Sequence, residues 1–143
     1  MGWRLDFKKF RAYLEKQYGV TNAYLFLGKI KANENLYKKL RSYGYKIVFK
    51  PTVFHGKKSN LRIKGNIDVE LALYAAAIEY DNYHKAVIVS GDGDFYSLIK
   101  YLLENSKLKK VIVPNHKYST LLKEFRKYIF LLQEVRQKVE NDT

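Results

Sequence analysis

The feature that most constrains the fold is a short apolar run, residues 86–90, that leads directly into Asp92 and Asp94. The run carries no charge and three of its residues are β-branched, which is typical of a strand covered on both faces of a parallel sheet. This order of strand, acidic turn and helix predicts an α/β fold with both acids at the carboxyl end of a strand, where ligands bind in open sheets. Beyond the turn, apolar residues recur at helical spacing at Phe95, Leu98, Ile99, Leu102 and Leu103.

The two acids of this turn are separated by a single residue. Gly91 and Gly93 allow the backbone to turn tightly, so that the carboxylates of Asp92 and Asp94 lie close together. Two ionised carboxylates repel, and a hard divalent cation relieves that repulsion. The turn is therefore a candidate metal site; the alternative is that Asp94 only caps the helix that follows.

Composition limits the classes of protein that remain. The chain has 143 residues, of which 47% are hydrophobic. Because this length is typical of one domain, we expect a single domain over residues 1–143. It contains no cysteine, which excludes disulfides, thiolate zinc sites and a cysteine nucleophile and favours a cytoplasmic location. No apolar run reaches the length of a membrane span, so we expect no membrane partner.

The charge of the chain is strongly positive. Its 27 Lys and Arg residues against 14 Asp and Glu residues give a formal charge of +13. A surface of this kind favours nucleic acid as the partner. The alternative is that the charged side chains only keep the surface hydrated and bind no nucleic acid.

Helical and strand patterns alternate along the chain, which predicts parallel strands joined by right-handed crossovers. Asp6 is expected to cap a first helix that ends before Gly19. On spacing alone, Asp68 is expected to cap a helix over residues 69–80. We expect one mainly parallel sheet between helices, with strands at residues 23–27, 45–49, 86–90 and 110–113 and a short edge strand at 128–132.

Residues 50–65 interrupt this pattern with a segment that contains no acid. Phe54 and His55 lie among its basic residues, and such a segment suits contacts with phosphates and stacking on bases. A solvated hairpin is the alternative. The candidate nucleic-acid-binding residues are Lys57, Lys58, Arg62 and Lys64.

Two motifs together resemble the signature of the NYN domain family, relatives of the PIN nucleases whose bacterial branch is called LabA-like. The first is Lys-Gly-Asn-Ile-Asp-Val-Glu-Leu at residues 64–71, and the second is Val-Ser-Gly-Asp-Gly-Asp-Phe at residues 89–95. The similarity extends over nearly the whole chain, since residues 2–6 and 114–119 also resemble segments of the family.

The resemblance implies a three-layer PIN-like or Rossmann-like α/β domain with a mainly parallel central sheet. It implies a metal-dependent endoribonuclease that hydrolyses phosphodiester bonds of RNA. Asp68, Asp92 and Asp94 match the family's acids, which bind Mg²⁺ or Mn²⁺, and Ser90 matches a small polar position at the strand end. These residues form the expected catalytic set.

Two departures from the family stand out. Members usually begin with a central strand that carries an aspartate and a following asparagine, and that strand is absent here. We expect that the sequence is truncated at its amino terminus, or that another segment, a partner or a second copy of the chain fills the gap. The second departure is Tyr74, where many relatives have another aspartate, so we expect weak metal binding.

Two alternative functions stay open at this point. One is an NYN-like module that binds RNA but cleaves it weakly or not at all. The other is a haloacid-dehalogenase-type phosphotransferase, which also places Asp-x-Asp at a strand end but has Thr or Val where this chain has Tyr96. The three histidines, His55, His84 and His116, lack the spacing of zinc ligands and are expected to be ordinary polar or core residues.

Overall fold

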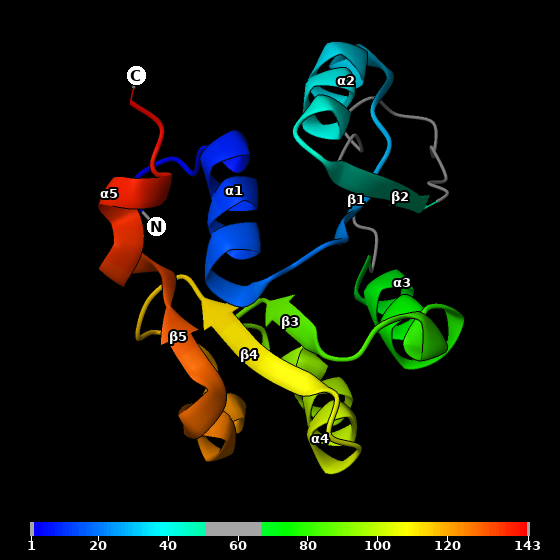
Figure 1. The fold of residues 1–143 in the computed structure, drawn as a ribbon, viewed down its shortest axis with the longest axis vertical. Helices are drawn as coiled ribbons and strands as arrows, with labels where there is room; N and C mark the ends of the chain where they lie inside the picture. Colours follow the sequence, from blue (N-terminus) through cyan, green and yellow to red (C-terminus); the bar gives the residue numbers. More distant parts are fainter. Residues whose placement is uncertain (1, 51–66, 143) are drawn as a thin grey trace, which may run out of the picture.

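The first helix of the chain is built as its capping residues predict. The computed structural model describes residues 2–50 and 67–142 (Figure 1). Helix α1 covers Phe7–Tyr18, and the Asp6 side chain accepts a hydrogen bond from the Lys9 N–H at 3.1 Å. The helix ends at Gly19, whose φ of 69° is the left-handed conformation that favours glycine.

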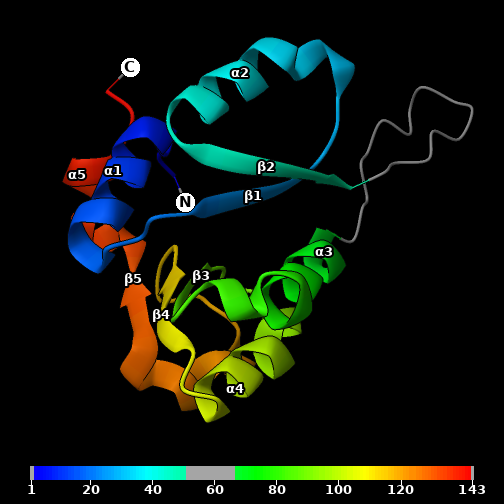
Figure 2. The ribbon, with the colours of Figure 1, turned by 45° about the vertical axis from the view of Figure 1, so that its right-hand side comes forward.

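A parallel pair of strands follows α1. β1 (Ala23–Gly28) pairs in register with β2 (Tyr45–Lys50), and the connection between them contains the short 3₁₀ helix η1 (Lys31–Asn33) and α2 (Glu34–Ser42). Helix α2 lies on one side of the pair and α3 (Ile67–Leu73) on the other (Figure 2). The small buried core between α2 and the strands consists of Ala23, Leu40 and Tyr45.

A second sheet of three parallel strands contains the acidic turn. Its order is β3 (Ala86–Val89), β4 (Leu108–Val113) and β5 (Ile129–Leu131), so β5 is the edge strand expected near residues 128–132.

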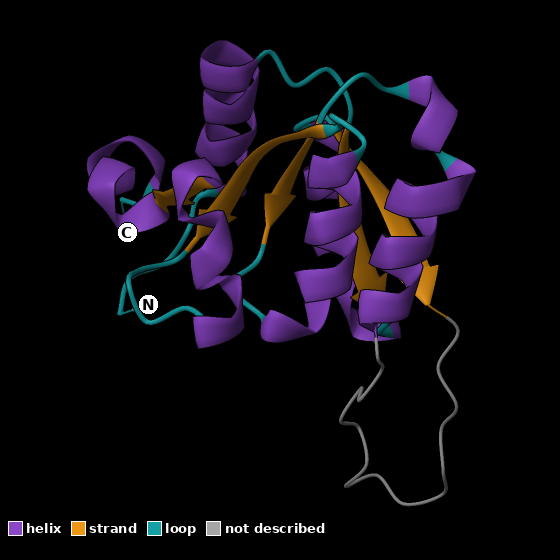
Figure 3. Ribbon diagram, turned by 90° about the horizontal axis from the view of Figure 1, so that it is seen from below, coloured by secondary structure: helices purple, strands orange, loops and turns teal. Residues whose placement is uncertain are grey.

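Helices pack on both faces of this second sheet. On one face, α4 (Tyr96–Glu104) and the 3₁₀ helix η6 (Thr120–Tyr128) bury Leu102 and Leu122 against β3 and β4. On the other face, α1 and α5 (Arg136–Val139), which follows η7 (Leu132–Val135), pack on Ile112. Figure 3 shows the strands of both sheets between helices, and this three-layer α/β architecture confirms the expected fold class.

The prediction of one continuous sheet is wrong. The strands are parallel as expected, but they form a two-stranded and a three-stranded sheet. In the part of the chain that the structure describes, β1 pairs only with β2, and β3 pairs only with β4 among the strands. The central strand that the resemblance implies is not among the described residues, so no backbone ladder joins β1 to β3.

The described part of the segment between the two sheets begins with α3, and its helical pitch changes along the chain. After α3 come a π-helical turn, η3 (Tyr74–Ile78), and a 3₁₀ turn, η4 (Tyr80–Asn82). Tyr74 packs edge-on against Phe26 of β1, with ring centroids 5.3 Å apart. Within the described parts of the chain, every helix is too short or too polar to cross a membrane.

Candidate active site

The acidic turn after β3 is held by hydrogen bonds within itself. The Ser90 hydroxyl accepts the N–H of Asp92 at 3.0 Å, and the Asp92 carboxylate accepts the N–H of Asp94 at 2.8 Å. Asp92 therefore caps the 3₁₀ turn η5 (Gly93–Phe95) that leads into α4. This corrects the alternative in which Asp94 is the helix cap, because the bond that caps the turn comes from the earlier acid and leaves Asp94 exposed.

A third acid reaches this turn from a different element. Asp68 lies inside the first turn of α3, so the expectation that it only precedes and caps this helix is wrong. One carboxylate oxygen from each of Asp68, Asp92 and Asp94 lies within 4.8 Å of the others. The two sequence motifs, separated along the chain, thus meet at one cluster of three acids.

The electrostatics of the cluster follow from this closeness. Partial burial raises the pKa of Asp68 above its ordinary value of 3.8, and the negative charges of Asp92 and Asp94 raise it further. A positive charge placed among the three acids would therefore stabilise the ionised form of the Asp68 carboxylate. Oxygen donors of this kind suit hard divalent cations such as Mg²⁺ and Mn²⁺.

The loop after β4 supports the acidic turn from behind. The Ser119 N–H donates to the Gly91 carbonyl at 3.1 Å. A Cβ atom on Gly93 would lie only 2.5 Å from the Ser119 hydroxyl oxygen, so a larger residue here would force Ser119 to shift. This role of Ser119 could not be predicted from the sequence, because it depends on a contact between two loops that are distant along the chain.

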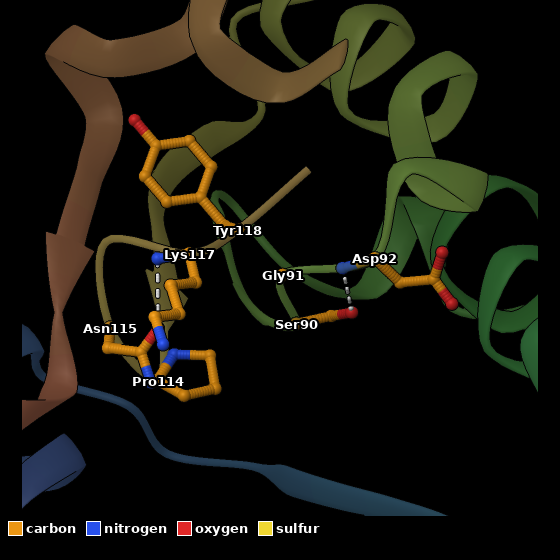
Figure 4. A pocket seen from close by; sticks show the side chains of 7 residues that line it. All are labelled: Ser90, Gly91, Asp92, Pro114, Asn115, Lys117 and Tyr118. Atoms are coloured by element: carbon orange, nitrogen blue, oxygen red, sulfur yellow. Dashed lines mark hydrogen bonds between the residues drawn. The ribbon is translucent and has the colours of Figure 1, made fainter. Parts of the chain in front are cut away.

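Two cavities lie beside the acids. The larger, about 450 Å³, is lined by residues that follow β3 and β4, including Ser90, Asp92 and Lys117 (Figure 4). The smaller, about 330 Å³, is lined by α3 and the start of α4, including Asp68 and Asp94. Asp92 and Asp94 therefore border different cavities, although their carboxylates belong to one cluster.

Of the remaining candidate positions, the structure describes Tyr74 but not the four basic residues. The four basic residues Lys57, Lys58, Arg62 and Lys64 lie outside the described residues. Tyr74 is packed with Tyr24 and Phe26, so the position where many relatives have an acid holds an aromatic contact with β1.

Parallel strands between helices, with three carboxylates gathered outside the carboxyl end of β3, define an α/β domain with an acidic site of the nuclease type. The chain belongs to the NYN domain family, a PIN-like, nuclease-type domain, since the family's sequence profile matches residues 1–132. A solved structure of similar fold is a protein of unknown function from Vibrio parahaemolyticus, with a TM-score of 0.71 and 20% identity over 91% of this chain and 80% of that chain. At this identity the likeness shows the fold alone. A search among curated proteins gave no match.

Proposed function

We propose that this chain is a metal-dependent endoribonuclease that hydrolyses phosphodiester bonds of RNA, with Mg²⁺ or Mn²⁺ as its cofactor. The observation that carries the proposal is the meeting of Asp68, Asp92 and Asp94, from two separate elements, within 4.8 Å. Family membership supports it, because an NYN domain is of the nuclease type.

The residues present fit a divalent cation. All three donors are carboxylate oxygens, and the pKa of Asp68 is raised first by its partial burial and then by the negative charges of Asp92 and Asp94. Mg²⁺ keeps several of its waters in protein sites, so acids at this spacing can reach a common ion directly or through water. When bound there, the ion would polarise a phosphoryl oxygen and lower the pKa of a water molecule.

The residues of the chain have distinct tasks in this proposal. The three acids hold the ion and orient the scissile phosphate. Ser90 fixes the turn by accepting the Asp92 N–H, and the Asp92 carboxylate lies on the side of the turn away from Asn115 and Lys117 (Figure 4). The charge of +13 and the basic residues 57, 58, 62 and 64 attract the nucleic acid strand.

The test is a cleavage assay on single-stranded RNA and DNA with Mg²⁺, with Mn²⁺ and with EDTA. We expect cleavage of RNA that depends on the metal and falls about a hundredfold or more in Asp92→Asn, since electrostatic stabilisation of the transition state is lost. Asp81→Asn removes an equal charge from an exposed position in η4, outside the cluster, and is expected to cleave at the wild-type rate. Equal rates in Asp92→Asn and wild type would contradict the proposal.

A second candidate function is an RNA-binding module without cleavage. The aromatic packing of Tyr74 favours it, because no fourth carboxylate comes from that position. RNA that binds tightly and is never cleaved, with Asp92→Asn binding as wild type does, would support this module. The phosphotransferase alternative expects the acidic turn after the first strand, whereas here the turn follows β3.

A further inference from the structure

The larger cavity opens at the carboxyl ends of two adjacent parallel strands. Ser90 and Gly91 follow β3, and the loop that begins at Pro114 follows β4. Adjacent strand ends of a parallel sheet are where small ligands bind in α/β proteins. Its volume of about 450 Å³ lies in the range of sites that hold one small molecule.

The lining of this cavity combines three kinds of chemistry. Lys117 offers a cationic donor, Asn115 an amide that both donates and accepts, and Tyr118 an aromatic ring. A nucleotide presents the matching groups, which are an anionic phosphate, the polar edge of a base and a flat base surface. The Asn115 side chain already accepts the Lys117 N–H at 2.9 Å, a bond that holds the loop and leaves the amide NH₂ as a donor.

The cavity and the acidic cluster share one residue. Asp92 lines the cavity, but its carboxylate points to the opposite side from Asn115, Lys117 and Tyr118 (Figure 4). The same carboxylate belongs to the cluster with Asp68 and Asp94. The cavity and the acidic cluster therefore adjoin one another at Asp92.

We propose that this cavity binds one unpaired nucleotide of a single-stranded RNA and so places the neighbouring phosphodiester at the acidic cluster. The inference deepens the proposed nuclease function and rests on it for the identity of the ligand. A base inside a duplex is stacked and paired, so it cannot enter a pocket of this size without leaving the helix. The cavity thus selects single strands over duplexes.

The test measures binding of a fluorescein-labelled single-stranded RNA of eight uridines in EDTA, where metal-dependent cleavage cannot consume the probe. The full chain is compared with Lys117→Ala and Asn115→Ala. Lys123→Ala is the matched control, because Lys123 is an exposed lysine of the following helix η6 and lines neither cavity. We expect Kd to rise about tenfold in Lys117→Ala, the effect of one charge-assisted hydrogen bond, and less than about threefold in Lys123→Ala.

Two further measurements separate this inference from the proposed function. A duplex made of the labelled strand and its complement is expected to bind wild type more weakly than the single strand and to respond equally to Lys117→Ala and Lys123→Ala. Equal effects of these two substitutions on the single strand, or equal binding of strand and duplex, would overturn the inference even if the protein cleaves RNA. Selective loss of binding in Lys117→Ala, with no cleavage by any variant, would uphold the nucleotide site and refute the nuclease.

Discussion

Asp68 is the residue on which the acidic cluster depends. It alone comes from α3, and its pKa is raised by its partial burial and, further, by the negative charges of Asp92 and Asp94. The folded chain therefore binds a proton at Asp68 more tightly than the unfolded chain does. Stability is lost as the pH rises from the ordinary pKa of 3.8 through the raised value, and above that window the ionised Asp68 destabilises the metal-free fold.

The first prediction concerns Asp68→Asn, which removes one of three like charges. In EDTA at pH 7 we expect the variant to have a higher Tm than wild type. Wild type is expected to gain about 2.7 kcal/mol when Mn²⁺ is present at a hundred times its Kd, and the variant to gain far less. Thermal melts followed by circular dichroism measure both effects.

The control for this prediction is Asp81→Asn, an exposed acid outside the cluster. It is expected to shift neither the Tm in EDTA nor the gain with Mn²⁺. A lower Tm for Asp68→Asn in EDTA would show that repulsion among the acids does not limit stability.

The acids of the site were predictable from the sequence, and their supporting contacts were not. Asp92 and Asp94 lie between an uncharged run of strand type and apolar residues at helical spacing, and this pattern is local in the sequence. Asp68 needed the resemblance, because its spacing alone suggested a helix cap. Ser119 and Lys117 gave no local signal, since their contribution arises only when the loop after β4 folds onto the turn after β3.

At the scale of elements, one lysine connects the helical segment before β3 to the beginning of β4. Lys107 immediately precedes β4 and donates hydrogen bonds to the carbonyls of Tyr80 and Tyr83. Its ammonium also lies 4.2 Å and 4.1 Å from the centroids of these two rings. The carbonyls are near the carboxyl end of the helical segment that starts with α3, where a cation is favourable.

The second prediction is that Lys107→Ala destabilises the chain by about 2 kcal/mol, through loss of charged hydrogen bonds and cation–π contacts. Denaturation in urea measures the change. Lys85→Ala, at an exposed position just before β3, removes the same charge and is expected to change stability by less than about 0.5 kcal/mol. Equal effects of the two substitutions would show that the contacts of Lys107 contribute nothing beyond charge.

The helices and strands themselves were largely foreseen, because caps and periodicity are local. Asp6 and Gly19 bound α1 as expected, and the strands begin within a few residues of their predicted positions. The division into two sheets was not foreseen. Strand pairing is a long-range property, and the alternation of patterns shows only that strands are parallel and not which of them are neighbours.

At the scale of the whole molecule, the two sheets differ in the core that supports them. The cluster under β3 and β4 includes fully buried Ile99, Leu102, Val111 and Leu122, whereas the described cluster under β1 and β2 consists of Ala23, Leu40 and Tyr45. Burial of apolar surface is the main source of stability. The two-stranded sheet is therefore the weaker part.

The third prediction follows for native-state hydrogen exchange. Amides of β1 and β2 are expected to exchange about a hundredfold or more faster than those of β4, because local opening of the weaker sheet needs less free energy than global unfolding. Exchange measured by NMR at neutral pH tests this, with the amides of α4 as an internal reference for the larger core. Uniform protection across both sheets would show that the chain unfolds as one cooperative unit.

Among the described residues, β1 and β3 each have an edge without a partner strand, and such edges also affect how copies of the chain meet one another. An open strand edge is a template for pairing with a further chain, and Val89 at the end of β3 is 44% exposed. The charge of +13 opposes such pairing by repulsion between molecules, and salt screens that repulsion over a Debye length of about 8 Å at physiological strength. Under the proposed function, added salt is therefore expected to have two effects at once: it weakens the binding of RNA and favours self-association through the open edges.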